Sequence, residues 1–267
     1  MAMNSTRRKL AIGTWSAPRE GNIYGKLTLN AEPALAYLAE VRERTGHKVT
    51  MTHFVGKAVA MALASSPGLN GRILWGKYIT HKTVDISYLV VLEDGGDLAK
   101  AKIERLDEKS MDEVALELRE MATKLREGKD KEFEASKSTL KMLPRFLVRP
   151  LLWLTGWLAS SLGVNIRALG VSKFPFGSAI ITSVGMFGLD EGFVPPTPFA
   201  RVPIYVLVGA VSDRPTVVDG EIIVQKQLTI TATLDHRFVD GFEGGRLAKI
   251  MRSVFEDPRQ LEAPATE

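Results

Sequence analysis

The chain has 267 residues, of which 45% are hydrophobic and 25% are charged, a composition typical of a soluble globular protein. It contains no cysteine, which excludes a disulfide framework, cysteine-ligated zinc and a cysteine nucleophile. The formal net charge of +4 is scattered, without the basic stripe of a nucleic-acid-binding module. We therefore expect no nucleic-acid partner. The lack of cysteine and of a secretory signal sequence favours a cytoplasmic location.

Two helices are predicted in the first quarter of the chain. The first begins after Asn30 and ends before Gly46, because apolar residues recur at helical spacing between these positions. The second covers about 52–66, where a wide apolar face stops at a Pro-Gly pair. Residues 1–29 are interpreted as an N-terminal arm that precedes the folded domain.

A strand and a charged helix are predicted in the middle of the chain. Residues 83–92 alternate in polarity, and their apolar members share one face, as in a half-buried strand. Residues 110–128 are rich in charge but carry one apolar stripe at helical spacing, made of Val114, Leu118, Met121 and Leu125. This pattern predicts a helix with one buried face and one solvated face.

The last third of the chain is mainly strands. The β-rich runs are 179–184, 204–212, 216–218, 221–225 and 228–234. Asp219-Gly220 stands between two β-branched runs and predicts a two-residue hairpin turn. A final helix is predicted over 242–255, followed by a polar tail, 259–267. Because strands do not alternate regularly with helices, we expect an α/β fold with a mixed sheet.

An apolar segment at 140–163 does not fit this scheme. Its uncharged part, Pro150–Gly163, is shorter than the roughly 20 residues that span a bilayer. Trp153 and Trp157 lie one helical turn apart within it. Three interpretations remain open: a helix that is buried or covered by another subunit, a helix on a membrane surface, and a lid over an apolar substrate pocket.

One heptapeptide carries residues suited to chemistry. It reads Asp235-His236-Arg237-Phe238-Val239-Asp240-Gly241 and lies between a predicted strand and the final helix. Histidine can act as a base near neutral pH because its reference pKa is about 6.5. By itself, a loop histidine beside aspartates has a structural role more often than a catalytic one.

The heptapeptide resembles the His-x-x-x-Asp-Gly signature of the chloramphenicol acetyltransferase-like superfamily. Its longer Asp-His-Arg-x-x-Asp-Gly form resembles that of the dihydrolipoyl acyltransferases, the core components of 2-oxo-acid dehydrogenase complexes. Further segments that are similar to this family lie at 52–62, 69–72, 181–188 and 214–220. We therefore interpret 30–258 as an acyltransferase catalytic domain, with an insertion at about 140–170.

The resemblance implies a two-layer fold, in which helices flank a mixed sheet, and a homotrimer with active sites between subunits. Coenzyme A would be a substrate, and His236 would be the general base that takes the proton from its thiol. Thr182 of a neighbouring subunit would donate a hydrogen bond to the oxyanion. Ser183 is the second choice, because adjacent residues of a strand should point to opposite faces. Asp240 would support the loop, and Asp235 and Arg237 would form a local ion pair. The resemblance implies no metal, and the sequence identifies no residues that bind coenzyme A.

The sequence also departs from the family pattern. No lipoyl domain is recognised before residue 30, so a lipoyl group would have to come from another protein, such as a dehydrogenase complex component. Residues 93–100 are charged where the family has an apolar run beside its substrate channel. The polar tail favours an isolated trimer, or an assembly built through the inserted helix instead. Two alternatives follow: acyl transfer to a different acceptor, or an oligomeric scaffold without activity, associated with a membrane through residues 140–163.

Overall fold

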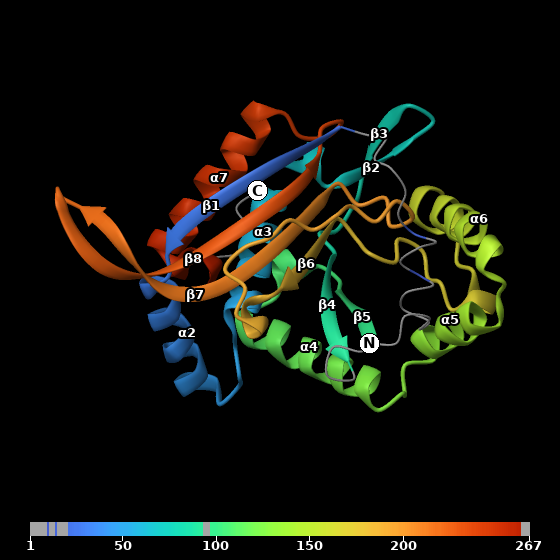
Figure 1. Ribbon diagram of the computed structural model, residues 1–267, viewed down its shortest axis with the longest axis horizontal. Coiled ribbons are helices and arrows are strands. Elements are labelled where there is room, and N and C mark those ends of the chain that lie inside the picture. The colour runs from blue at the N-terminus through green and yellow to red at the C-terminus, as the bar shows by residue number, and fades with distance from the viewer. Residues whose placement is uncertain (1–9, 11–13, 15–20, 93–96, 263–267) are drawn as a thin grey trace.

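The computed structural model describes residues 10, 14, 21–92 and 97–262. A mixed six-stranded sheet forms its centre, in the order β1-β8-β7-β6-β4-β5 (Figure 1). The central pairs β4–β6 and β6–β7 are parallel and the other pairs are antiparallel. The strands are β1 (Asn22–Asn30), β4 (Ile86–Leu92), β5 (Asp97–Ile103), β6 (Ala179–Ser183), β7 (Ile204–Val218) and β8 (Glu221–Asp235).

Helices form the second layer. Those that pack against one face of the sheet are α2 (Glu32–Thr45), α3 (Met51–Ala64), α4 (Met111–Arg126) and α7 (Gly241–Glu256). Beyond β5, at one end of the molecule, lie α5 (Lys131–Met142), α6 (Arg145–Gly156) and a π-helical turn, Trp157–Ser161 (Figure 1). A separate hairpin is formed by β2 (Gly71–Leu74) and β3 (Lys77–Thr80). The predicted α/β fold with a mixed sheet and flanking helices is therefore confirmed.

Several predicted elements are confirmed with small shifts of their ends. The predicted helix 110–128 is α4, and a capping box between Ser110 and Glu113 fixes its start. The four short β runs after residue 204 merge into two long strands, because the hairpin keeps them paired across a bulge between Val208 and Val211. Its turn is at Asp219 and Gly220, whose positive φ angles of 51° and 89° match the predicted two-residue turn.

Both predicted boundaries of the domain need correction. Residues 22–29, assigned to an arm, belong to β1, which pairs with β8 along its whole length. This edge strand was missed because polar side chains interrupt its apolar pattern. At the other end, Pro258–Glu262 forms a 3-10 turn that buries Leu261 in the core, so the predicted polar tail begins inside the fold.

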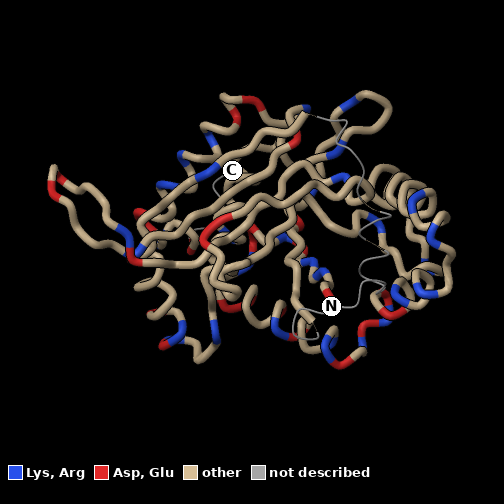
Figure 2. Tube along the Cα trace, in the orientation of Figure 1, with Lys and Arg blue, Asp and Glu red and all other residues tan. Residues whose placement is uncertain are grey.

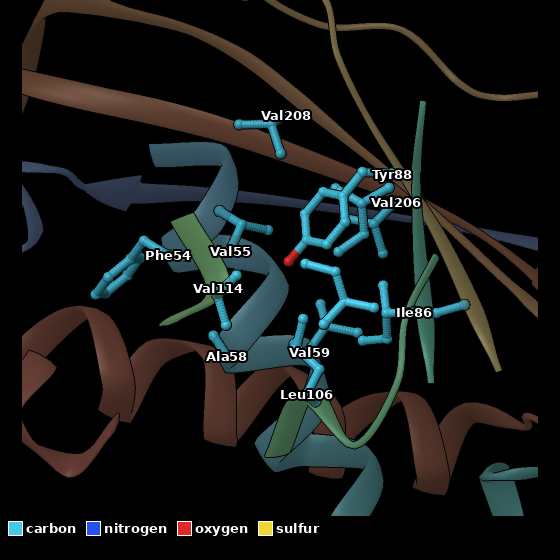
Figure 3. Packing of buried hydrophobic residues seen from close by; sticks show 14 of the residues in the cluster. Phe54, Val55, Ala58, Val59, Ile86, Tyr88, Leu106, Val114, Val206 and Val208 are labelled. Carbon is cyan, nitrogen blue, oxygen red and sulfur yellow. The ribbon is translucent and has the colours of Figure 1, made fainter. Parts of the chain in front are cut away.

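Close packing between α3 and the sheet fixes the main core. Tyr88 of β4 is buried, and its hydroxyl points at α3 among Val55 and Val59 (Figure 3). Gly56 lies opposite this ring, and a Cβ atom there would be 1.8 Å from the Tyr88 Oη. The absence of a side chain at position 56 is what allows α3 to approach the sheet this closely.

The two faces of the sheet have different neighbours. Ile181 of β6 points at the helices, together with Val206 of β7. Ile180 points to the other face, where Tyr205 and the loop residue Ala200 pack against it. Because side chains alternate along a strand, this assigns a face to every residue of β6.

Charged residues are distributed over helices and loops on all sides, as the scattered net charge predicts (Figure 2). No helix in the described part of the chain is long and apolar enough to cross a membrane. The apolar segment 140–163 forms α6 and the π-helical turn. Within one chain it is not a buried helix, because Phe146 and Trp153 are 77% and 62% exposed. The other interpretations of this segment remain open.

Candidate active site

The His236 loop joins the end of β8 to the start of α7. The amides of Phe238 and Val239 both donate to the carbonyl of Asp235, at 2.9 and 3.1 Å, which closes a tight turn. The Val239 side chain is fully buried and anchors this turn in the core. The His236 amide donates to the carbonyl of Gly21 at 3.1 Å. The backbone of His236 is therefore fixed on both sides, while the residue itself is exposed.

Asp235 and Arg237 form the ion pair that the sequence predicts. The Arg237 Nη2 lies 2.6 Å from Oδ2 of Asp235, and the Arg237 Nε lies 3.0 Å from Oδ1. The Arg237 amide also donates to Oδ1, at 2.9 Å. Asp235 and Arg237 flank His236 in the sequence, so their ion pair fixes the backbone on both sides of the histidine. The two residues therefore orient the loop.

Asp240 caps the N-terminus of α7. Its Oδ1 accepts hydrogen bonds from the amides of Phe242 and Glu243, at 2.8 and 3.0 Å. These amides have no partner inside the helix, and a negative charge at a helix N-terminus is favourable. The contacts of Asp240 therefore fit the predicted role of loop support.

Tyr78 is a contact of this loop that sequence reasoning missed. It lies on β3, and its hydroxyl donates to the carbonyl of Arg237. Its ring also meets Phe238 edge to face, with 5.4 Å between centroids. The sequence did contain a signal for the hairpin, since Trp75-Gly76 stands between two short β-forming runs. Nothing in it pairs that hairpin with a loop about 160 residues away.

Thr182 lies near the end of β6, on the face away from the helices. It is in register with Leu207 of β7 and, through it, with Thr231 of β8. Ser183 is in register with Val208 and so points at the helix core. The predicted opposite orientation of the two hydroxyls is confirmed. The Thr182 hydroxyl has no hydrogen-bond partner among the described residues and is partly exposed.

Thr182 and His236 of one chain lie far apart. His236 follows Thr231 by five positions, which is about 17 Å along an extended strand, and two strand spacings add about 10 Å across the sheet. A base and an oxyanion donor must each lie about 3 Å from the reacting group. A single chain therefore does not bring these two side chains to one substrate.

Neither a metal site nor a coenzyme site is defined by these contacts. Among residues 10, 14, 21–92 and 97–262, no group of three or more His, Asp or Glu side chains could hold a metal ion. Residues 93–96, part of the charged segment at 93–100, lie outside the described residues. The rest of that segment begins β5, where Asp97 pairs with Lys137 of α5 at 2.9 Å.

Comparison with known protein families shows which family this chain belongs to. The model of the 2-oxoacid dehydrogenases acyltransferase (catalytic domain) family matches residues 21–142 and 165–263. The chain belongs to this family. The matched ranges include β1 and the His236 loop, and residues 143–164, which hold α6 and the π-helical turn, lie between them.

Several named acyltransferases are similar to this family member. The dihydrolipoyllysine-residue acetyltransferase component of the acetoin cleaving system of Bacillus subtilis is 28% identical over 221 residues, which are 82% of this chain and 44% of that protein. The succinyltransferase component of the Escherichia coli 2-oxoglutarate dehydrogenase complex is 24% identical over the same shares. The chain thus spans less than half the length of these relatives.

Solved structures show the same fold. A probable dihydrolipoamide acetyltransferase from Listeria monocytogenes superposes with a TM-score of 0.68 at 22% identity, covering 96% of this chain and 93% of that one. A chloramphenicol acetyltransferase reaches 0.51 at 10% identity, covering 96% and 98%. The two-layer fold of the chloramphenicol acetyltransferase type is therefore confirmed for this 2-oxoacid dehydrogenase acyltransferase domain.

Proposed function

We propose that this chain is an acyltransferase that moves an acyl group between a thioester and the thiol of coenzyme A, or another acceptor. The observation that carries the proposal is the placement of His236. Within a domain of the acyltransferase family, it is an exposed histidine on a loop whose backbone and flanking residues are all fixed. Such a residue can reach a substrate without reorganising the loop.

His236 is the general base in this reaction. It takes the proton from the attacking thiol, and the thiolate adds to the thioester carbonyl. When the tetrahedral intermediate collapses, the original carbon–sulfur bond breaks and the proton passes from His236 to the leaving thiolate. General base catalysis of this kind typically contributes about 10²–10⁴-fold.

Thr182 stabilises the intermediate by donating a hydrogen bond from its hydroxyl to the oxyanion. One donor of this type is worth about 3 kcal/mol when it is fixed in place. In support, its hydroxyl has no partner among the described residues and points to the face of the sheet that the helices leave open. Ser183 would donate from the buried face and is the weaker candidate.

The active site lies between subunits of a homotrimer. Thr182 and His236 are too far apart in one chain, so a site with both needs a second copy. Large apolar side chains also follow Thr182 closely: Met186, Phe187 and Leu189 are each more than half exposed. Apolar side chains gathered beside a polar group of this kind are typical of a subunit contact.

Two structural neighbours support the proposal by analogy. A dihydrolipoamide acetyltransferase of Azotobacter vinelandii is described with a serine, a histidine and an asparagine in its catalytic mechanism, and another neighbour is the cubic core of a pyruvate dehydrogenase complex. By analogy, the acyl donor is a lipoyl thioester on another protein or a small acyl thioester, in the cytoplasm.

Thioester exchange tests this proposal. Parent chain and His236→Ala are incubated with acyl-coenzyme A donors and free dihydrolipoamide, and acyl transfer is measured. We expect a loss of about 10²–10⁴-fold in the variant, with an unchanged circular dichroism spectrum and melting temperature, because His236 is exposed. Equal turnover in both proteins would refute the role of His236. No turnover in the parent with any donor would favour the scaffold.

A further inference from the structure

The outward face of α6 is apolar and uncovered in the single chain. Phe146 and Trp153 are 77% and 62% exposed, and Leu147 and Leu154 follow them at the same spacing. Positions separated by seven residues lie on one side of a helix, so these four side chains form a continuous stripe. A soluble protein rarely exposes a stripe of this kind unless something binds there.

Contacts on the opposite side of α6 and its π-helical continuation hold this stripe outward. Gly156 packs so closely on Phe199 that an added Cβ would lie 2.5 Å from the Phe199 carbonyl oxygen. The Ser160 hydroxyl donates to that same carbonyl at 3.2 Å. Arg201 donates to the Ser161 hydroxyl at 2.9 Å. Because the inner side is fixed to the domain, the segment cannot turn its apolar stripe inward.

Trp75 extends the apolar stripe beyond α6. It stands at the tip of the β2–β3 hairpin, is 76% exposed, and meets the Trp157 ring edge to face at 6.1 Å. The Arg72 Nε of the same hairpin donates to the carbonyl of Ser161 at 2.9 Å. Two elements far apart in the sequence thus share one surface, which we call the α6 surface: Trp75, Phe146, Leu147, Trp153 and Leu154.

The part of the sequence that carries α6 is free of acidic residues. Residues 135–189 contain no aspartate or glutamate, and their cations are Lys137, Lys141, Arg145, Arg149, Arg167 and Lys173. Arg145 and Arg149 lie on α6 itself and are exposed. Lysines and arginines mark α6, whereas the first turn of α5 also carries Glu132 and Glu134 (Figure 2). The partner of the α6 surface should therefore be anionic as well as apolar.

We propose that the α6 surface binds to the face of a lipid bilayer that contains anionic lipids. Tryptophan and phenylalanine partition to the boundary between headgroups and acyl chains, and arginine can reach phosphate groups from there. With 12 residues, α6 is about 18 Å long, so it would lie flat in the interface and not cross it. The chain would be bound peripherally through a segment outside the matched ranges of its family.

Two other occupants fit the surface less well. A second copy docked face to face would place Arg145 and Arg149 near their own equivalents, which is unfavourable for like charges. A protein partner would need an acidic, apolar groove of matching shape. A bilayer needs no matching shape and supplies both the apolar layer and the negative charge.

Vesicle flotation tests the proposal on the full chain. The probes are vesicles of equimolar phosphatidylglycerol and phosphatidylcholine, compared with pure phosphatidylcholine. We expect binding to the anionic vesicles that weakens as salt is raised. Phe146→Ser with Trp153→Ser should lower the partition coefficient at least about tenfold. Arg145→Gln with Arg149→Gln should lower it about thirtyfold.

Matched controls lie elsewhere on the chain. Ile222→Ser with Val224→Ser removes two equally exposed apolar residues from the β7–β8 hairpin, at the end of the molecule away from α6 (Figure 1). Lys124→Gln with Arg126→Gln removes two exposed cations from α4. Both double variants should float like the parent.

Clear outcomes would overturn the proposal. These are no flotation of the parent, equal binding to neutral vesicles, and equal losses in the control variants. A fourth is a change of oligomer mass in Phe146→Ser with Trp153→Ser while vesicle binding is retained, because the α6 surface would then be a subunit interface. The proposal does not rest on acyl transfer, so His236→Ala should float like the parent.

Discussion

Subunit complementation tests the intersubunit site most directly. His236→Ala removes the base from every subunit of one protein, and Thr182→Ala removes the oxyanion donor from every subunit of the other. Alone, the first should lose about 10²–10⁴-fold of activity and the second about 10²–10³-fold. Thr182 is partly exposed and His236 is exposed, so both variants should fold.

The expected recovery follows from the register and the symmetry. Thr182 and His236 of one chain are about 20 Å apart, from about 17 Å along β8 and about 10 Å across two strands. In the proposed homotrimer, each site combines His236 of one subunit with Thr182 of the next. In any trimer that contains both variants, one of the three interfaces carries both intact residues. If equal amounts of the two variants assemble at random, about three quarters of the trimers contain both. Since each mixed trimer has one intact site of three, about a quarter of the parent activity should return.

The assay is co-expression of the two variants with different affinity tags. Particles that carry both tags are isolated in two steps, their mass is measured, and thioester exchange is compared with the parent and with each variant alone. Every doubly tagged trimer should have about a third of the parent activity. Activity no higher than the mean of the two variants would refute a site shared between subunits, provided that the mass shows mixed trimers.

Three further predictions concern the loop and the core. Gly56→Ala should lower the free energy of unfolding, measured in urea, by about 1–3 kcal/mol, because the new methyl group collides with Tyr88. Adding Tyr88→Phe to this variant should restore part of the lost stability. If it restores none, the collision with Tyr88 is not the cause. Asp240→Ala should lower the melting temperature, because it removes a helix cap worth about 1 kcal/mol. Asp240→Asn can still cap the helix and should keep both the stability and the turnover of the parent. A large loss of turnover in Asp240→Asn would instead indicate that Asp240 takes part in catalysis. Burial, with a smaller contribution from Arg42, lowers the pKa of His53 to about 4 from 6.5. As the pH falls, the His53 side chain of the unfolded chain is protonated before that of the folded chain, so the free energy of unfolding should decrease between pH 6.5 and 4. In His53→Asn this decrease should be smaller. An equal dependence on pH in both proteins would contradict the lowered pKa of His53.

Much of the fold is predictable from the sequence where the cause is local. The turn at Asp219-Gly220 is set by two adjacent residues that tolerate positive φ, and the start of α4 by Ser110 and Glu113. Asp240 shows the same locality, because a cap reaches only two or three residues along the chain. Elements whose partners are distant were missed: β1 is a strand only because β8 supplies its hydrogen bonds.

The features of the candidate site also fall into local ones, which the sequence predicts, and ones that depend on distant segments. The sequence by itself determined the heptapeptide around His236, the ion pair of its neighbours and the opposite orientation of Thr182 and Ser183, because each depends on residues close in the chain. Only the tertiary structure decided that Tyr78 holds this loop, that one chain separates Thr182 from His236, and that α6 presents its apolar stripe outward. These features depend on strand register and on packing between distant segments, which no local pattern encodes.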